Sequence, residues 1–296
     1  MSLSLNRKTD YLNEYGLNLI QNLINKVPAG LESYLKEDYY CNFNHPSIKK
    51  LAEQVAGQYD TNKEKAVALF YWVRDNILYR VSYWQRTASD TLAEREGTCT
   101  NKANLLAALL RSQNIPAGYG VMKVYGQEYL GPICIPMVRK YINNVSTHVY
   151  LGVYLENRWV KVDPSDDYEF SMNTSFFNPP SLLVDWDGEK DAKLNLPKEH
   201  ILSDIFPLSN IVFLMGKNVH FPKILVKVSN EVIKFTRNNK VEFSLDANVP
   251  VELQKIFFNY LRKKKIIFYI SVVFFEFINS NFYLFRIFTS KKKVKK

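Results

Sequence analysis

The chain has 296 residues, and 47% of them are hydrophobic, which excludes a wholly disordered protein and allows a sizeable buried core. Its formal net charge is +10, but eleven of its 39 basic residues lie in residues 255–296 beside one acidic residue. Residues 1–254 therefore carry 28 residues of each sign, and we expect no nucleic-acid partner. The three cysteines, with no apolar leader run at the start, indicate free thiols and a cytoplasmic location.

The first 80 residues predict helices. Apolar residues recur at helical spacing in residues 17–27 and again from Ile48 to Val55. Thr61 and Glu64 then form a capping-box pattern that opens a third amphipathic helix. We expect the apolar stripes of these helices to face the core.

After the third helix the hydrophobic period changes. Residues 77–84 predict a short strand, and a polar connection leads to a helix that begins at Cys99 and ends at Ile115-Pro116. Residues 117–125 predict a strand. Residues 126–145 contain Gly and Pro at several positions and predict an irregular loop that borders a pocket.

A β-hairpin is predicted next, with strands at residues 147–155 and 158–163 and a turn at Glu156-Asn157. In the first strand the aliphatic residues alternate with a second set that begins at His148. We expect the aliphatic set to face the core and His148 to lie on the opposite, more polar side.

We divide the chain into four predicted parts. They are an N-terminal helical segment at 1–60, a catalytic core at 61–172, an extension with β-strands at 173–254 and a basic aromatic tail at 255–296. Within the extension, residues 223–246 have the alternation of β-strands.

The tail's longest apolar run, Ile266 to Phe275, has ten residues, whereas a membrane-spanning helix needs about 20. We expect a terminal β-hairpin that turns at residues 279–281. Weak contact of the lysine-rich ends of residues 255–296 with an anionic membrane is the alternative.

Cys99 stands where a helix begins, with Thr98 as its expected N-cap. The unpaired N–H groups and the dipole at a helix start favour a thiolate, and the same N–H groups can hold an oxyanion. A lone cysteine in a helix is more often a small core residue, which is our expectation for Cys41 and Cys134.

A cysteine nucleophile needs a base, and a base needs an orienting acceptor. His148 on the predicted strand and Asp163 at the end of the next strand suit these roles. A single His on a strand is more often structural, and an Asp before Pro is often a turn residue. The three residues in this order are much more specific than any of them alone.

Three stretches resemble the transglutaminase-like superfamily: "GTC" at 97–99, "LLRSQNIPAGYG" at 109–120 and "THVYLGVYLENRWVKVDPS" at 147–165. The resemblance covers about residues 60–170. It departs from the family pattern at the helix exit, where Asn114 replaces the usual Gly and Gly118 the usual Arg.

The resemblance implies an α+β fold of the papain-related type, with N-terminal helices packed on an antiparallel β-sheet. It also implies that Cys99 is the nucleophile, His148 the general base and acid, and Asp163 the orienting carboxylate. The chemistry would be acyl transfer from a peptide or amide bond through a Cys thioester.

We favour a cysteine peptidase or amidase over a transglutaminase. The expected partner is a protein or peptide substrate, or a small amide or amine, with no metal and no cofactor. Two alternatives stay open. One is an arylamine N-acetyltransferase-like enzyme, suggested by "REGTC" at 95–99. The other is a non-catalytic peptide-binding module on the same fold.

Overall fold

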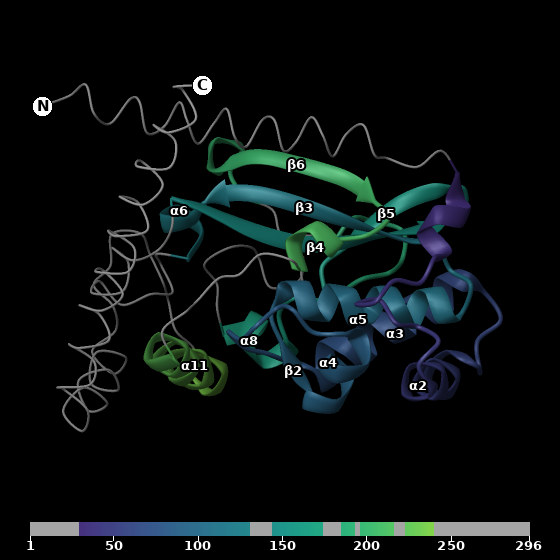
Figure 1. Cartoon of the computed structure of the whole chain (residues 1–296), viewed down its shortest axis with the longest axis horizontal. Helices are drawn as coiled ribbons and strands as arrows, with labels where there is room; N and C mark the ends of the chain where they lie inside the picture. The colour runs from purple at the N-terminus through teal and green to yellow at the C-terminus, as the bar shows by residue number, and fades with distance from the viewer. Residues whose placement is uncertain (1–29, 131–143, 174–184, 193–195, 216–222, 240–296) are drawn as a thin grey trace, which may run out of the picture.

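The computed structural model describes residues 30–130, 144–173, 185–192, 196–215 and 223–239. Within them, a four-stranded antiparallel sheet forms one layer and a group of helices covers one of its faces (Figure 1). The predicted α+β class, with helices packed on an antiparallel sheet, is confirmed. The helix predicted at residues 17–27 and the tail at 255–296 lie outside the described residues.

The members of the helical layer are η1 (Leu31–Leu35), α2 (Pro46–Ala56), α3 (Asn62–Asn76), α4 (Ala88–Glu94) and α5 (Cys99–Ser112). Helices α2, α3 and α5 were predicted, whereas η1 was not and α4 lies in the segment predicted as a polar connection. Thr61 and Glu64 cap α3 reciprocally, as predicted, so two N–H groups at its start are satisfied locally.

Helix α5 is the centre of the fold, and its residues from Thr100 to Arg111 are all buried. It contacts the sheet through β3 and β4 and also contacts α2, α3 and α4. Such a helix is enclosed on every side, which explains why it carries polar residues only where they have buried partners. It ends at Ser112, three residues before the predicted Ile115-Pro116 stop, and Asn114 follows in the left-handed conformation (φ 57°).

The sheet has the order β5-β4-β3-β6, and all its pairings are antiparallel. Its strands are β3 (Ala117–Tyr125), β4 (Val145–Leu155), β5 (Arg158–Val162) and β6 (Ile201–Leu208). The predicted β4–β5 hairpin is confirmed, and its turn residues Glu156 and Asn157 have φ of 49° and 62°. Paired left-handed residues match the twist of a two-residue hairpin. The aliphatic residues of β4 lie in the core, as the alternation predicted.

Two predictions around the helical layer need correction. The strand predicted at 77–84 is only β1 (Leu78–Tyr79), which pairs in parallel with β2 (Glu96–Gly97). It stops because the backbone of Val81 bonds the side chain of Asn230 instead of another strand. The loop predicted at 126–145 begins with a short helix, α6 (Gly126–Leu130).

The strand prediction at 223–246 is wrong for its first part, because residues Lys223–Asn238 form helix α11. Its residues Asn230, Ile233 and Arg237 fall at helical spacing, and the helix buries Ile233 while Asn230 and Arg237 bond distant residues. Alternating apolar residues fit both periods, so tertiary contacts decided this segment. The remaining elements are α8 (Tyr168–Asn173), η3 (Lys198–His200) and α10 (Val212–Met215).

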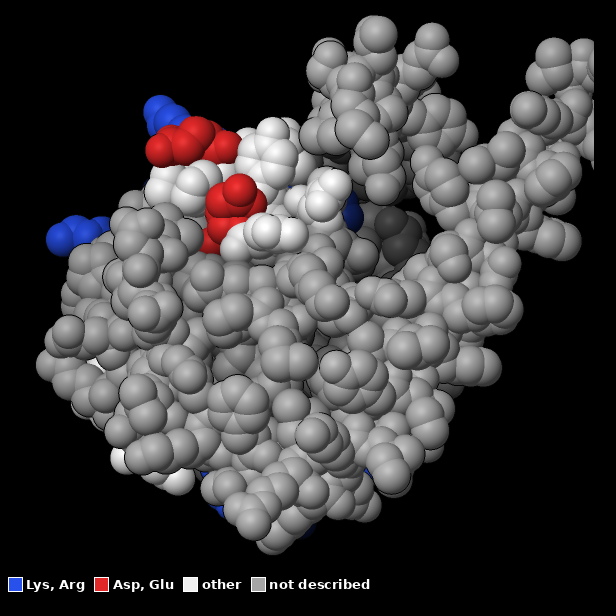
Figure 2. Space-filling model, turned by 90° about the vertical axis from the view of Figure 1, so that its left-hand side faces the viewer, with Lys and Arg blue, Asp and Glu red and all other residues white. Residues whose placement is uncertain are grey.

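The described surface carries both signs of charge. On the face shown in Figure 2, acidic and basic side chains both occur among the described residues. No helix within the described ranges is long and apolar enough to cross a membrane.

Candidate active site

Cys99 is the first residue of α5, and a local capping box fixes the helix start there. The Thr98 N–H donates to Asn101 Oδ1 over 3.0 Å, and the Thr98 hydroxyl accepts from the Asn101 N–H over 3.5 Å. Gly97 is required just before this turn, because a Cβ there would lie 2.6 Å from the Asn101 Cβ. The predicted N-cap is confirmed, and Cys99 is partly exposed at the mouth of the helix.

His148 and Asp163 come from the two strands of the hairpin. His148 lies in β4, Asp163 follows the end of β5, and His148 Nε2 lies 2.6 Å from Asp163 Oδ2. Both residues are buried, with exposures of 1% and 2%. His148 does lie opposite the aliphatic face of β4, but that side is buried rather than polar, because Tyr150 on the same side is also fully buried. Hydrogen bonds in such an enclosed site are electrostatically strong.

Ser165 holds the carboxylate of Asp163 from the other side. The Ser165 N–H donates to Asp163 Oδ1 over 3.0 Å, and its hydroxyl donates to the same oxygen. Burial opposes ionisation of Asp163, but the charge of His148, its hydrogen bond and those of Ser165 together lower the pKa of this carboxyl below its ordinary value. Asp163 is thus a fixed anion aimed at one nitrogen of the imidazole.

Tyr129 contacts the other imidazole nitrogen. Its hydroxyl lies 3.0 Å from His148 Nδ1, and the two rings meet edge to face at a centroid distance of 5.8 Å. Tyr129 lies in α6, inside the segment that the sequence predicted to border a pocket. The imidazole is therefore held through both nitrogens.

The electrostatics of the site favour a thiolate–imidazolium pair. Burial opposes ionisation of Cys99, but hydrogen bonding to His148, the charge of His148 and the Val149 backbone N–H outweigh it and lower the pKa of the thiol. Burial likewise opposes protonation of His148, but the charge and hydrogen bond of Asp163, with the Cys99 contact, raise its pKa well above 6.5. A thiolate is the nucleophilic form of cysteine.

The structure thus brings Cys99, His148 and Asp163 together and adds groups that the sequence did not single out. Tyr129 and Ser165 are two of these, and the serine had a signal, because a residue two positions after Asp commonly closes an Asx turn. Lys102, one turn into α5, is a third. It is fully buried and donates to the Ile77 carbonyl over 2.6 Å.

The other candidate residues lie elsewhere. Cys41 is fully buried in the core, as expected, beside the Arg111 guanidinium at 3.6 Å. Cys134 lies outside the described residues. His45 caps α2 through Ser47, and the ranges with described positions contain no cluster of three or more side chains suited to a metal ion.

A helix-borne cysteine beside a buried His–Asp pair on an antiparallel sheet defines a thiol-enzyme type of site. Residues 49–164 match the model of the transglutaminase-like superfamily, so this segment of the chain is similar to that superfamily. The match includes all three residues of the site. It supports a thiol enzyme.

Several solved structures are similar to the chain. One is a Cytophaga hutchinsonii protein provisionally described as a cysteine protease (24% identity, TM-score 0.37, covering 48% of this chain and 44% of that chain). Another, from Parabacteroides distasonis, is provisionally described as a protease (14% identity, TM-score 0.32, covering 46% and 25%). A third is the periplasmic domain of TgpA from Pseudomonas aeruginosa (19% identity, TM-score 0.31, covering 44% and 45%). The chain spans less than half the length of each, and no curated protein matches it.

Proposed function

We propose that the protein is a cysteine peptidase or amidase that cleaves a peptide or related amide bond through a thioester on Cys99. The observation that carries the proposal is the buried 2.6 Å contact between His148 and Asp163 beside a thiol of lowered pKa. This combination supplies a nucleophile, a proton carrier and an orienting anion.

In the proposed reaction the Cys99 thiolate attacks the carbonyl carbon of the substrate. The Cys99 backbone N–H, which has no acceptor within the helix at this position, stabilises the oxyanion. The C–N bond then breaks, His148 gives its Nδ1 proton to the leaving amine, and a thioester remains.

Water completes the proposed cycle. His148 takes a proton from the attacking water, the C–S bond breaks, and the acid product leaves with the thiolate restored. The partial exposure of Cys99 supports hydrolysis, because water can reach the thioester. The two described cysteines are free thiols, which supports a reducing, cytoplasmic location for the proposed enzyme.

The test is incubation of the full chain with a peptide library, with and without a primary amine, followed by mass spectrometry. We expect cleaved peptides under both conditions and no cleavage by Cys99→Ala. Cys41→Ala is the matched control, since Cys41 lies in the core, and it should cleave once its fold is verified by circular dichroism. Amine adducts without cleavage would assign a transglutaminase instead, and cleavage by Cys99→Ala would reject the proposal.

A further inference from the structure

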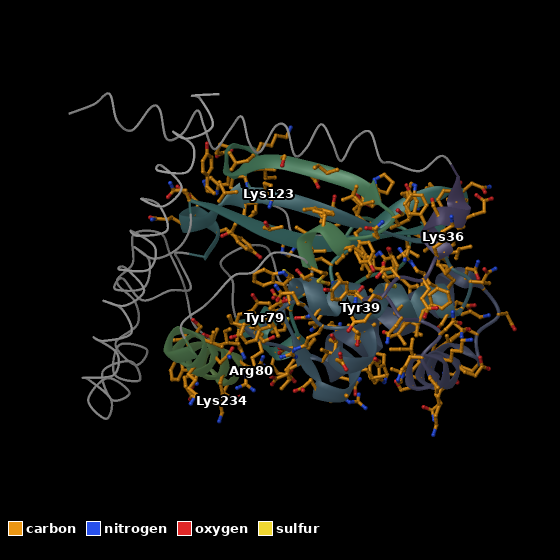
Figure 3. All side chains as sticks on the ribbon, viewed as in Figure 1. Lys36, Tyr39, Tyr79, Arg80, Lys123 and Lys234 are labelled. Carbon is orange, nitrogen blue, oxygen red and sulfur yellow. The ribbon has the colours of Figure 1, made fainter. Side chains whose placement is uncertain are left out.

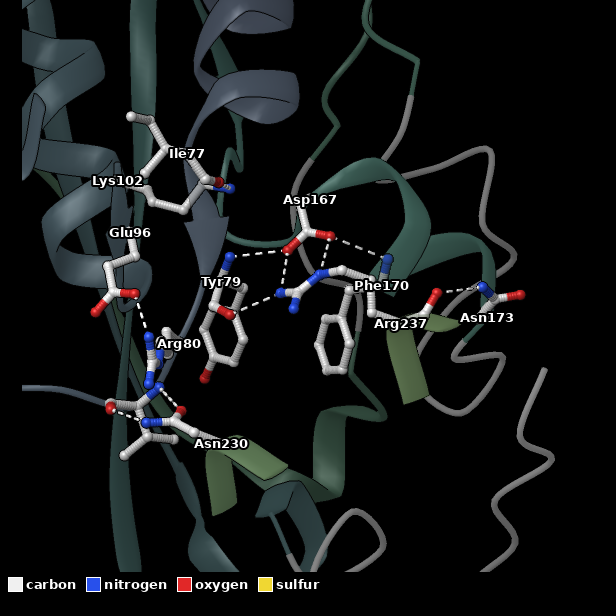
Figure 4. Close-up of polar contacts among 11 residues, drawn as sticks. Ile77, Tyr79, Arg80, Glu96, Lys102, Asp167, Phe170, Asn173, Asn230 and Arg237 are labelled. Carbon is white, nitrogen blue, oxygen red and sulfur yellow. Dashed lines mark hydrogen bonds and ion pairs between the residues drawn. The ribbon is translucent and has the colours of Figure 1, made fainter. Parts of the chain in front are cut away.

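Helix α11 lies outside the residues matched by the superfamily model, yet its Arg237 enters the neighbourhood of the site. Arg237 Nε donates to Asp167 Oδ1 over 2.8 Å, and Nη2 donates to Asp167 Oδ2 over 2.6 Å (Figure 4). Nη2 also donates to the Tyr79 carbonyl over 2.9 Å. A two-pronged contact of this kind fixes geometry as well as charge.

Asp167 belongs to the same short segment as Asp163. It is 1% exposed and accepts from the N–H groups of Tyr79 over 2.8 Å and Phe170 over 3.1 Å. Burial opposes its ionisation, but the Arg237 hydrogen bonds, with Lys102 nearby, lower the pKa of this carboxyl. Asp166 of the same segment also interacts electrostatically with Asp167, and burial with the charges of Asp163 and Asp167 raises the pKa of Asp166 to about 7.

Tyr79 connects Asp167 to the nucleophile's side of the site. It pairs with Gly97 in the parallel β1–β2 contact, two residues before Cys99, and the Arg80 N–H donates to the Gly97 carbonyl over 2.9 Å. Chain connections and contacts therefore form a closed series. It runs along the chain from Cys99 to Gly97, and through Tyr79 to Asp167. It continues along the chain to Asp163, and through His148 back to Cys99.

Arg237 is the ionic partner of Asp167 and bonds both segments at once. A second anchor holds α11 in place, because the Asn230 side chain bonds both backbone groups of Val81 over 2.9 Å (Figure 4). By contrast, Lys234 on the same helix is exposed, and Figure 3 shows it on the side of α11 away from the sheet.

We propose that Arg237 is a positioning residue for the catalytic site: by holding Asp167 against β1, it fixes the segment that aims Asp163 at His148. This inference rests on the proposed function. It gives α11, which lies outside the matched residues 49–164, a role in the catalytic site.

The reasoning predicts a specific change when Arg237 is replaced. A buried carboxylate without its cation moves toward water or takes up a proton, and the 163–167 segment moves with it. A looser Asp163 stabilises the imidazolium less, and a less available imidazolium stabilises the thiolate less. The pH midpoint for ionisation of Cys99 should therefore rise.

The experiment measures the rate of Cys99 alkylation by iodoacetamide against pH on the full chain, with the modified peptide identified by mass spectrometry. For Arg237→Gln we expect the pH midpoint for ionisation of Cys99 to rise by about one unit. At pH values below this midpoint, alkylation should then be about tenfold slower than in the wild-type protein. Arg237→Lys keeps the charge without the two-pronged contact and should show about half of that shift. Asp167→Asn combined with Arg237→Gln removes both charges and should restore most of the wild-type midpoint. Lys234→Gln is the control on the same helix.

Melting temperatures of all variants separate positioning from stability. The inference would be overturned if Arg237→Gln melts at a lower temperature but its pH midpoint for Cys99 ionisation equals that of Lys234→Gln. If Arg237→Gln does not fold, Arg237→Lys decides by the same comparison. A wild-type Cys99 that reacts no faster than an ordinary thiol would instead reject the proposed function, which keeps the two failures distinct.

Discussion

Replacing Asp163 with Asn tests the electrostatic design of the site, because it keeps the size of the side chain and removes its charge. Asp163 Oδ2 lies 2.6 Å from His148 Nε2, and both side chains are at most 2% exposed. An opposite charge this close shifts a pKa by about 1 to 3 units, and each unit corresponds to about 1.4 kcal/mol. The imidazolium should therefore lose about 1.4 to 4 kcal/mol of stabilisation.

The sign of the expected pH effect follows from the two shifts. Asp163 raises the pKa of His148, and His148 lowers the pKa of Cys99. In Asp163→Asn the pKa of His148 should fall and that of Cys99 should rise, so the pH window of the ion pair narrows from both sides. Alkylation of Cys99 at about pH 6.5 should be at least about tenfold slower.

The assay is site-resolved alkylation by iodoacetamide from pH 4 to 10, for which the wild-type protein gives the reference curve. Asp185→Asn is the control, because Asp185 is exposed and its ion-pair contact with Arg74 is 3.8 Å long. An Asp163→Asn protein that is folded and keeps the wild-type midpoint would refute this account of the site.

Two further predictions concern the stability of the fold and the part of the chain that the site requires. Lys102→Met should lower the free energy of unfolding in urea by about 3 kcal/mol, because the Ile77 carbonyl and the nearby carboxylates lose a buried cation whose pKa burial lowers to about 8. Lys50→Met on the exposed side of α2 should stay within about 0.5 kcal/mol, and equal losses would contradict the reasoning. A protein ending at Pro250 should keep a fast-reacting Cys99, since the proposed triad ends at Asp163, and a folded truncation with an ordinary thiol would show that the tail helps build the site.

Local patterns predicted the parts of the structure that local forces decide. The capping residue Thr98 and the apolar positions behind it predicted the start of α5, so the position of Cys99 at its mouth followed from about fifteen residues. The β4–β5 hairpin was equally predictable, because alternation sets the strand faces and the Glu156-Asn157 turn sets their register. His148 and Asp163 were therefore identified from one short stretch.

The extent of β1 and the helical state of α11 could not be predicted in this way. Residues of α11 alternate as well as they repeat at helical spacing, and Asn230 reaches Val81, 149 positions earlier in the chain. Tyr129 gave no sign of its contact with His148, because its segment has no regular pattern. Such contacts depend on which surfaces meet after folding.

The sequence by itself predicted the three groups of the proposed chemistry: a thiol at a helix start, an imidazole on a strand and a carboxylate at the end of the next strand. Only the tertiary structure decided how that chemistry is tuned. His148 and Asp163 are buried as a pair, and the Tyr129 hydroxyl lies 3.0 Å from the second imidazole nitrogen. Arg237 bonds the acid-bearing segment from a helix 70 positions beyond Asp167. The physical reason is that hydrogen-bonded turns and side-chain periodicity act over a few residues, whereas burial and paired charge depend on distant segments that meet only in the folded chain.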